Sequence, residues 1–464
     1  MSVALHWFRN DLRAEDNPGL AAAQKSGLPV VGLFIATPAQ WQAHDDAPIK
    51  RDFWRRNLIE LDAALKQLGI PLVCTEVQAY RDIPAHLEQL LPALKVAELH
   101  CNKEYPLYEL RRDETVAVVC KRLGVRMHQH LDQVLVEPAA VLNKSGEPFK
   151  VFTPCARAMR EHLQGTIATY TVGKQTLLGL PAIAQARQIA ELDFGTPQSR
   201  WEQLWPAGET MARKRLAEFC QQRIGAYKAQ RDFPAIAGTS SLSPYINTGV
   251  VSIRQCWLAS RMWQDNDGVL TWQNELLWHD FYKYVMWHFP HVCMHKPWRN
   301  DVGHVPWRQD QDDFQRWCEG RTGIPIVDAA MRQLLQTGWM HNRLRMLGAM
   351  FLTKHLLIDW RWGERWFMQQ LVDGDFPANN GGWQWSASTG TDAAPYFRIF
   401  NPVTQSQRFD PEGRFLRQYL PELAELDDHS IHDPGLLRPE RYPAPMIDLG
   451  FGRERALNAF KRVQ

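Results

Sequence analysis

The chain has 464 residues, which is long enough for two or more domains that each bury a core. Its 53 Lys+Arg and 51 Asp+Glu residues leave a net charge of +2, so overall charge does not indicate a nucleic-acid partner, and any basic patch must be local. No apolar run is long enough to span a bilayer, and Arg9, Asp11 and Arg13 interrupt the N-terminus where a signal peptide would be apolar. We therefore expect a soluble cytoplasmic monomer with no membrane partner.

The cysteine and tryptophan contents give two further indications about metal sites and aromatic residues. Eight cysteines are scattered without Cys-x-x-Cys pairs or Cys/His spacing, which predicts reduced thiols, no structural zinc and no other metal site. The 19 tryptophans, many of them in the last two hundred residues, are more than core packing usually requires.

Residues 1–130 alternate short apolar runs with helical patterns. The runs at 3–8, 30–35, 71–77, 97–101 and 125–130 predict strands, and apolar residues recur at helical spacing over 54–68, 83–94 and 110–123. This alternation predicts an α/β domain with a parallel sheet covered by helices. No Gly-x-Gly-x-x-Gly follows the first strand, so the pattern is Rossmann-like without an ordinary dinucleotide site.

The rest of the chain changes character twice. Residues 131–200 lose strong periodicity and gain Gly, Pro, Thr and Gln, which predicts an interdomain connector with short helices. Residues 201–464 are helical in pattern, with an apolar stripe over 326–334 that ends at Gly338, an apolar run over 340–357, and a third around Trp362 and Trp366. We expect this larger part to be an all-α domain.

The stretch 373–398 looks like the centre of a binding site. It is too rich in Gly, Asn and small residues for a helix interior, and too polar for a central strand. Its two carboxylates, two side-chain amides and two indoles predict a large, flat, partly polar ligand; these are Asp373, Asp375, Asn379, Asn380, Trp383 and Trp385. The alternative is an ordered surface loop whose tryptophans fill the core.

Three other segments carry chemistry. Four hydroxyls, from Thr239, Ser240, Ser241 and Ser243, precede a predicted helix with Pro at an early position, which suits a phosphate and equally suits plain N-capping. Glu275, Trp278 and Tyr282 share a helix at helical spacing, so the acid lies either over a core stripe or in an apolar pocket that raises its pKa.

The third segment is 339–346, Trp-Met-His-Asn-Arg-Leu-Arg-Met. Asn342 and Met346 are one helical turn apart, so a polar tip and a soft apolar tip share one face. Arg345 is a predicted partner for Asp373.

Taken together, these motifs resemble the photolyase/cryptochrome family, and more narrowly its class I cyclobutane pyrimidine dimer photolyases. The resemblance rests on Asp-Gly-Asp at 373–375, Asn-Asn-Gly-Gly-Trp-Gln-Trp at 379–385 and Thr-Gly-Thr-Asp-Ala-Ala-Pro-Tyr-Phe-Arg at 389–398, and it extends over nearly the whole chain. It implies a helical domain that binds FAD, which is active when fully reduced, and light-driven repair of pyrimidine dimers in DNA.

By this resemblance the cofactor site draws on many of the segments above. Its expected members are Tyr227, Thr239, Ser240, Ser241, Leu242, Ser243, Trp272, Arg345, Asp373, Gly374, Asp375 and Asn379.

The resemblance likewise assigns the lesion site. The expected catalytic residues are Glu275, Trp278, Asn342, Met346, Asn379 and Trp385, and the expected DNA contacts are Arg231, Glu275, Trp278, Tyr282, Asn342 and Arg343. Six-four photolyases and animal cryptochromes typically carry His at the Asn342 position, so Asn342 favours cyclobutane dimers. His279 and Asp280 stand where relatives often have Arg and Glu, which puts the detailed DNA contacts at those positions in doubt.

Two further assignments follow from the resemblance alone. Trp383, Trp360 and Trp307 match the family's chain of three indoles that leads from the flavin to the surface, although each by itself is typical of a core residue. His44, Glu109 and Cys293 lie in surroundings like those of the family's folate antenna, 5,10-methenyltetrahydrofolate, although Tyr108 and Met294 depart from that pattern.

Two alternatives remain. A cryptochrome-type blue-light receptor has the same fold and flavin, and Asn379 together with Glu275, Asn342 and Met346 disfavours it. A non-photochemical nucleotide-binding α/β protein accounts for the first half of the chain and leaves the aromatic helical half without a purpose.

Overall fold

The structure, a computed structural model, describes residues 2–177, 179–263, 266–299, 302 and 304–463. The chain divides into Met1–Gly225 with Ser240–Pro290, which we call unit 1, and Ala226–Thr239 with His291–Gln464, which we call unit 2. These two units do not coincide with the predicted domains, which are 1–130, 131–200 and 201–464. The predicted domain division stays a prediction.

Unit 1 contains a parallel sheet of five strands in the order β3-β2-β1-β4-β5. The strands are β1 Val3–Phe8, β2 Val30–Ala36, β3 Leu72–Glu76, β4 Val96–Asn102 and β5 Arg126–His130. All five predicted strands are present within one or two residues, and the predicted parallel α/β arrangement is confirmed.

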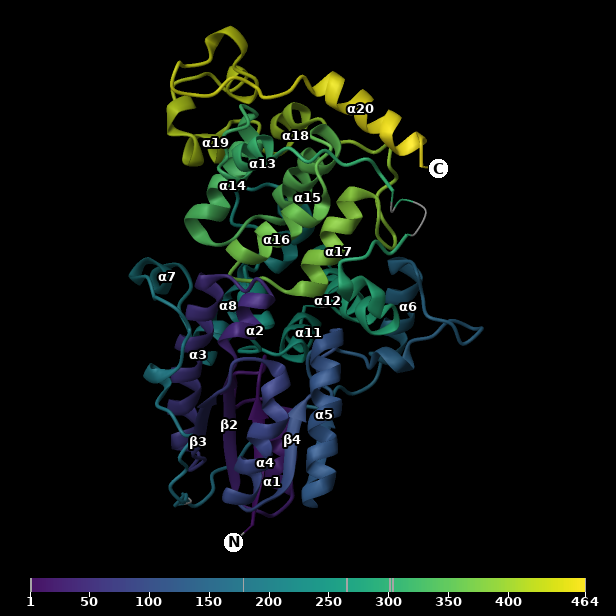
Figure 1. The fold of residues 1–464 in the computed structure, drawn as a ribbon. Coiled ribbons are helices and arrows are strands. Elements are labelled where there is room, and N and C mark those ends of the chain that lie inside the picture. Colours follow the sequence, from purple (N-terminus) through teal and green to yellow (C-terminus); the bar gives the residue numbers. More distant parts are fainter. Residues whose placement is uncertain (1, 178, 264–265, 300–301, 303, 464) are drawn as a thin grey trace. The chain divides into compact units, whose positions relative to one another are not determined.

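The helices of unit 1 are α1 Pro18–Lys25, α2 Pro38–Ala43, α3 Pro48–Gln67, α4 Ile83–Ala93, α5 Leu107–Leu123, α6 Phe152–His162, α7 Ser199–Leu204, α8 Glu209–Gln222, α10 Ser243–Asn247, α11 Ile253–Arg261 and α12 Asp267–His288. The helices α1, α3, α4 and α5 pack along the sheet, whereas α8, α11 and α12 lie beyond one end of it in Figure 1. Short 3-10 turns lie at η1 Tyr80–Asp82, η2 Pro138–Ala140, η3 Ile189–Glu191 and η4 Ile224–Ala226. The segment 131–200 holds only short helices, as the loss of periodicity predicts.

The two faces of the sheet differ in chemistry because side chains alternate along each strand. One face is apolar, and Leu5 and Leu99 pack there against α4 and α5. The opposite face, on which α1 packs, carries His6, His100 and Asn102. Gly19 in α1 is required there, because a Cβ would come within 2.6 Å of the His6 ring.

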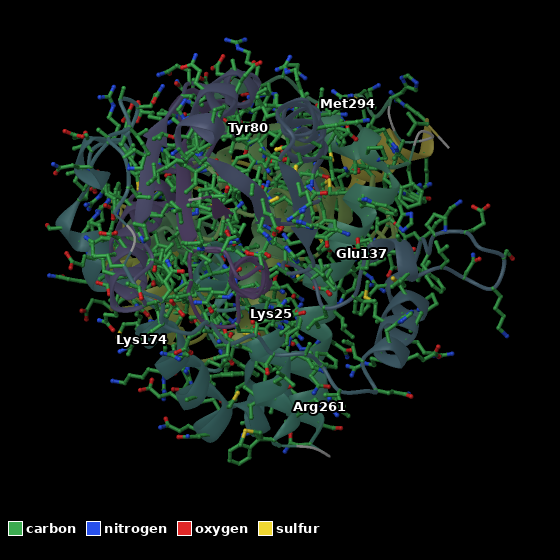
Figure 2. The ribbon with its side chains drawn as sticks, turned by 90° about the horizontal axis from the view of Figure 1, so that it is seen from below. Lys25, Tyr80, Glu137, Lys174, Arg261 and Met294 are labelled. Atoms are coloured by element: carbon green, nitrogen blue, oxygen red, sulfur yellow. The ribbon has the colours of Figure 1, made fainter. Side chains whose placement is uncertain are left out.

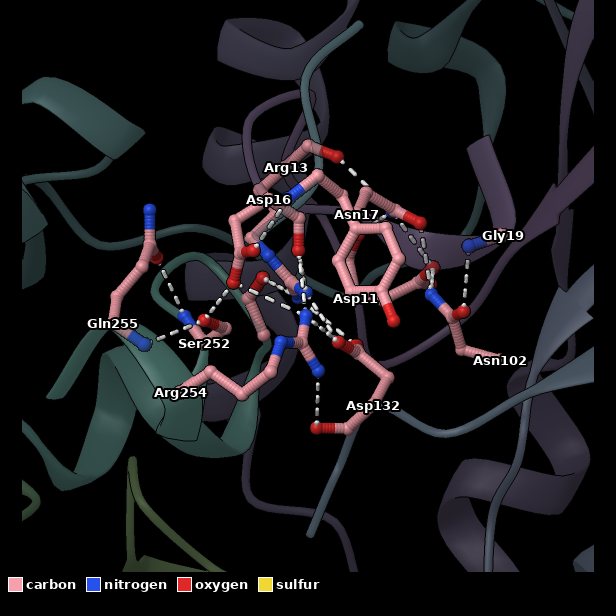
Figure 3. A network of polar contacts seen from close by, with 12 residues as sticks. Asp11, Arg13, Asp16, Asn17, Gly19, Asn102, Asp132, Ser252, Arg254 and Gln255 are labelled. Atoms are coloured by element: carbon pink, nitrogen blue, oxygen red, sulfur yellow. Dashed lines mark hydrogen bonds and ion pairs between the residues drawn. The ribbon is translucent and has the colours of Figure 1, made fainter. Parts of the chain in front are cut away.

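A buried ionic network ties the loop after β1 to α11 within unit 1 (Figure 3). Arg254 donates to the Asp132 carboxylate at 2.9 Å and to the Asp16 carbonyl at 2.7 Å, while Arg13 donates to Asp132 at 3.0 Å. Ser252, the N-cap of α11, also donates to Asp16. Each charge has an opposite partner, which is the condition for burying it without a large cost. The polar run after β1 therefore has a structural role.

The elements of unit 2 are helices joined by loops, and together with α8 and α10–α12 of unit 1 they confirm the predicted helical character of residues 201–464. The helices of unit 2 are α9 Tyr227–Gln230, α13 Gln311–Cys318, α14 Pro325–Thr337, α15 Asn342–Met350, the π-helix η7 Phe351–His355, α16 Trp360–Gln370, α17 Phe376–Ala387, α18 Pro402–Phe409, α19 Arg414–Tyr419 and α20 Leu449–Lys461. Short turns lie at η5 Pro290–Met294, η8 Pro421–Leu423, η9 Ser430–His432 and η10 Gly435–Leu437. The predicted stripe at 326–334 lies in α14, which ends at Gly338 in the left-handed conformation that favours glycine.

The prediction for 373–398 is wrong in one respect: residues Phe376–Ala387 form the helix α17 in spite of Asn379, Asn380 and two glycines. Asp375 caps its N-terminus by accepting from the Ala378 N–H at 3.2 Å, and Pro377 lies in its first turn. Packing of α17 against α15 and α16 outweighs the low intrinsic propensity.

The eight cysteines are unpaired and buried, in agreement with the predicted reduced thiols. Among the described residues, no helix is both long enough and apolar enough to cross a membrane.

Candidate active site

Helix α15 presents the most discriminating predicted pair. His341 caps the helix, accepting the Arg343 N–H on Nδ1 at 3.2 Å, so that Asn342 begins the first turn and Met346 lies one turn later. Asn342 is exposed and Met346 is half-buried. Burial lowers the pKa of His341 to about 4, so this imidazole is neutral at pH 7. The exposed start of α15 thus offers an amide rather than a proton donor.

The predicted ion pair between Arg345 and Asp373 is present. The Arg345 Nη2 lies 3.0 and 2.8 Å from the two carboxylate oxygens of Asp373, and its Nε donates to the Met340 carbonyl at 2.8 Å. Asp373 and the following Gly374 are buried. The pair fixes the chain just before α17 against α15, which orders the predicted cofactor segment.

The two amides of α17 differ in what they offer. Asn379 donates from Nδ2 to the Glu364 carbonyl at 2.9 Å, and among the described residues its Oδ1 has no hydrogen-bond partner. Asn380 is buried and accepts from Gln384 at 2.9 Å, and its Nδ2 is a buried donor without a partner. A buried donor without a partner, such as the Asn380 Nδ2, is costly in a folded protein unless a ligand meets it, whereas water can reach the half-buried Asn379. Trp385, also on α17, is half-buried.

Helix α12 carries Glu275, Trp278 and Tyr282 on adjoining turns, as predicted. The Trp278 ring stacks on Phe152 with centroids 3.7 Å apart and planes 8° apart, and it also contacts the Tyr282 ring, with centroids 5.5 Å apart and planes 34° apart. Glu275, Trp278 and Tyr282 are half-buried, whereas Trp272 is buried against Phe219.

The departures at 279 and 280 have a structural explanation. The Asp280 carboxylate is buried, accepts from the Leu135 N–H at 2.6 Å and lies 3.3 Å from the His279 Nδ1. Burial raises the pKa of Asp280. Asp280 therefore anchors the connector rather than facing a ligand.

The hydroxyl segment precedes α10. Thr239, Ser240, Ser241 and Ser243 are all half-buried, Leu242 is buried, and Pro244 lies in the first turn of α10, as predicted. Ser241 has φ +50°, an uncommon conformation for a residue other than glycine. Tyr227, the other predicted contact, is buried in α9 under the Arg231 guanidinium.

The two predicted DNA-contacting arginines share an acid. Arg343 lies 2.8 Å from the Asp232 carboxylate and covers the Phe409 ring, while the Arg231 Nε lies 3.9 Å from the same carboxylate. Asp232 thus gathers two guanidinium groups at one place in unit 2. Sequence reasoning missed Asp232, although an acid directly after Arg231 was a visible signal.

The three predicted indoles belong to one aromatic core of unit 2. Trp360 and Trp383 are only 1% and 2% exposed, and Trp307 is half-buried at the edge of the same cluster, against Phe460. Gly363 in α16 is required, because a Cβ would come within 2.1 Å of the Trp383 ring. Trp307 is thus the most exposed of the three, and their role as an electron-transfer chain stays a prediction.

The predicted antenna residues of unit 1 form a polar cluster. Glu109 is buried at the start of α5, where its Oε1 accepts from the Tyr80 hydroxyl at 3.2 Å and lies 3.7 Å from the His44 ring nitrogen; Tyr80 is labelled in Figure 2. Its Oε2 is buried without a hydrogen-bond partner, and burial raises the Glu109 pKa. The third predicted residue, Cys293, is buried in unit 2.

Comparison with known families matches most of the chain. Residues 4–173 match the model described as DNA photolyase, and residues 272–462 match the FAD binding domain of DNA photolyase. A protein of Vibrio cholerae named deoxyribodipyrimidine photo-lyase is 43% identical over 474 residues, which cover 100% of both chains. An Escherichia coli protein of the same name is 41% identical, over 100% of this chain and 99% of its own. This chain belongs to the DNA photolyase family.

Solved structures of the photolyase family and of a cryptochrome share the fold. A class III photolyase from Agrobacterium tumefaciens superposes with a TM-score of 0.89 at 33% identity, covering 100% of this chain and 98% of its own. An archaeal photolyase from Sulfolobus tokodaii with two FAD molecules gives a TM-score of 0.85 at 29% identity, and a Synechocystis cryptochrome gives 0.85 at 28%. Each of these two covers 99% of both chains. Because photolyases and a cryptochrome share the fold, the fold alone does not decide between repair and signalling.

The predicted site residues of this photolyase-family chain divide between the units. Glu275, Trp278 and Tyr282 belong to unit 1, while Asn342 and Met346 belong to unit 2. Within each unit the predicted neighbours lie on common helices, and their meeting around one ligand stays a prediction. Sequence reasoning missed Phe152 as the stacking partner of Trp278, because a contact between residues so far apart leaves no mark in local periodicity.

Proposed function

We propose that this chain is a class I photolyase that repairs cyclobutane pyrimidine dimers in DNA with blue light. The observation that carries the proposal is the start of α15, where Asn342 is exposed, Met346 follows on the same face, and the adjacent His341 is buried and neutral. Splitting a cyclobutane ring by electron transfer needs hydrogen bonds to the bases and no proton donor at this position. An amide next to a thioether suits that task.

The described residues fit FAD. The unpartnered Asn379 Oδ1 and Asn380 Nδ2 offer an acceptor and a donor on one helix, and the Arg345–Asp373 pair holds the segment that precedes them. We assign the pyrophosphate to the half-buried hydroxyls of Thr239, Ser240, Ser241 and Ser243, with Tyr227 nearby in sequence and Trp272, Leu242, Gly374 and Asp375 as further contacts.

Bound in its reduced form, FAD supplies the electron that light drives into the lesion, and the protein supplies binding and electrostatics. We assign Glu275 and Asn342 to hydrogen bonds with the thymine edges, which stabilise the charge that develops there. Met346, Trp385 and the half-buried Trp278 pack against the flipped bases. Photolyases as a class flip their target out of the duplex, and the unstacking cost is lowest for a damaged base.

Arg231 and Arg343 are proposed phosphate contacts, with Tyr282 beside the lesion. Their shared neighbour Asp232 holds both guanidinium groups in place before DNA arrives, which reduces the entropy lost on binding. Because phosphate contacts release counterions, we expect the affinity for DNA to fall steeply with salt.

We further propose 5,10-methenyltetrahydrofolate as the antenna, bound by His44, Glu109 and Cys293. The support is the buried Glu109 Oε2, an acceptor that the N–H groups of a pterin ring would meet. Glu109→Ala should therefore lower folate retention, whereas Glu114→Ala, an exposed acid on the same helix, should not. Extraction of a deazaflavin, or equal folate retention in both variants, would overturn this assignment.

The main proposal is tested with an oligonucleotide that contains one thymine dimer. Purified, chemically reduced protein should reverse the dimer under blue light and not in the dark. Flavin absorption without any repair would favour the cryptochrome-type receptor, and protein without flavin would favour a nucleotide-binding α/β protein. The cytoplasmic location and monomeric state stay predictions.

A further inference from the structure

A cluster of imidazoles lies on the polar face of the sheet at its β5 edge. Strand register sets His6 of β1 beside His100 of β4, and His100 beside His128 of β5. Glu98 lies two residues before His100 and therefore on the same face. His130 joins the group from the end of β5, where its ring is parallel to that of His100.

Three of these side chains converge. The Glu98 Oε2 is 3.0 Å from the His100 Nε2 and 3.9 Å from the His128 Nε2, and each of the three residues offers a ligand atom within 4.8 Å of the other two. The Glu98 and His100 side chains are 11% and 4% exposed, whereas that of His128 is 42% exposed. The cluster is thus buried on the side of Glu98 and His100 and open to solvent on the side of His128.

We propose that Glu98, His100 and His128 bind a single divalent transition-metal ion of the Zn²⁺ class. Two imidazole nitrogens and one carboxylate oxygen are a common protein donor set for zinc, with a fourth position left to water. Metal–ligand bonds of about 2.0–2.2 Å place neighbouring donor atoms at separations close to those found here. The His100 and His128 planes differ by 26°, so the exposed His128 ring must turn for both nitrogens to point at one ion.

The surroundings support this set of ligands. The His100 Nδ1 lies 3.1 Å from the His130 Nε2, so a metal on Nε2 leaves an N–H on Nδ1 that His130 can accept, the outer-shell contact that metal-bound histidines require. Arg126 pairs with the other oxygen, Oε1, and leaves Oε2 to the imidazoles.

The consequence is a link between the edge strand β5 and its neighbour β4. This site is independent of the proposed repair chemistry, since it uses no predicted flavin, lesion or antenna residue. An ion that binds only the folded state stabilises that state as its concentration rises.

The test is calorimetric titration of ZnCl₂ into the chelator-treated full-length protein at neutral pH. We expect one saturable site in the wild type. His128→Ala should abolish it, and His130→Phe should weaken it about 10–100-fold, as expected for an outer-shell change. The matched control is His162→Ala, which removes an exposed imidazole from α6 and should bind like the wild type.

Two further measurements keep the proposal open to refutation if a variant misfolds. Glu98→Gln preserves the side-chain shape and should weaken Zn²⁺ binding, and X-ray absorption of the zinc-loaded wild type should show two imidazoles and no sulfur. Equal binding by His128→Ala and His162→Ala, sulfur ligation, or no saturable site overturns the proposal.

Discussion

Tryptophan is used in two different ways in the two units. On α12, Trp278 is half-buried, and its ring stacks on Phe152 while part of its surface remains exposed. In unit 2, Trp360 and Trp383 are enclosed, and the Trp383 ring touches Phe367 at 4.9 Å and Trp317 at 5.9 Å between centroids.

The difference shows that burial, rather than residue type, decides what an indole does. A ring with one free face is a platform for stacking a base, and its loss weakens binding. A ring enclosed on all sides has no room for a ligand, and it contacts only neighbouring side chains of the protein. Trp307, half-buried at the margin of the second group, is the one member of the three that water reaches.

The largest expected effect comes from Trp307→Phe. We expect this change to abolish light-driven reduction of oxidised flavin by an external reductant, because phenylalanine is far harder to oxidise than indole. Flavin absorption during illumination measures it. Chemically reduced Trp307→Phe should still repair dimers, since that reaction does not require the indole chain.

Trp278→Phe is the matched control for that change. It keeps a stacking ring on Phe152 and should photoreduce like the wild type. Normal photoreduction by Trp307→Phe, or failure of the pre-reduced variant to repair, contradicts the assignment of the three indoles.

Trp278→Ala tests the role of the half-buried indole on α12. Loss of base stacking should weaken affinity for dimer-containing DNA by about 1–3 kcal/mol, with photoreduction unchanged. Fluorescence anisotropy with damaged and undamaged duplexes measures this affinity. Equal weakening for both duplexes would show that Trp278 does not contact the lesion.

Glu275→Ala should have a smaller effect. Because Glu275 is half-buried, water can replace part of the lost hydrogen bond, so we expect a loss near the lower end of about 1–3 kcal/mol. The repair yield per absorbed photon should fall while the flavin content is unchanged. A yield equal to that of the wild type would remove Glu275 from the site.

Local pattern was enough to predict much of the fold. The strands are visible in the sequence as short apolar runs, and α14 as an apolar stripe that ends at Gly338. Such patterns arise because the buried face of an element determines the spacing of its apolar residues. The pattern failed at α17, where tertiary packing holds a helix through Asn379 and Asn380. The Arg345–Asp373 pair could be predicted from the sequence. The acid-rich segment has few basic partners in the neighbouring motifs, so the choice was small.

Other features depend on register or on distant contacts, which local sequence does not encode. The absence of cysteine spacing predicts no metal site, which stays a prediction, and the juxtaposition of Glu98, His100 and His128 depends on the pairing of β4 with β5. Phe152 meets Trp278 and Asp232 meets Arg343 through chain segments far apart in sequence. Such sites appear only once the strands and helices are assembled.

The smallest expected effect concerns a cation inside the aromatic core of unit 2. Lys354, in the π-helix η7, is buried with its Nζ 3.7 Å from the centroid of Phe460, the ring that Trp307 also contacts. It donates to the Ser388 hydroxyl at 2.8 Å, but burial prevails and lowers its pKa from 10.5 to about 7. A charged Lys354 therefore lowers the free energy of unfolding, because its ammonium is buried away from water.

The sign of the pH dependence follows from that pKa. Below pH 7 Lys354 is charged in the folded and the unfolded protein, and the folded state bears the cost of the buried charge. Between pH 7 and 10.5 only the unfolded state keeps the proton. The free energy of unfolding therefore rises with pH in this range, by at most about 1.4 kcal/mol per pH unit. Lys354→Met should flatten the rise, and Lys461→Met, at an exposed position of α20, should leave it unchanged. Denaturant unfolding at several pH values measures both variants. An unchanged slope in Lys354→Met would mean that the contacts with Ser388 and Phe460 keep the ammonium charged, so that this enclosed aromatic group tolerates a buried cation.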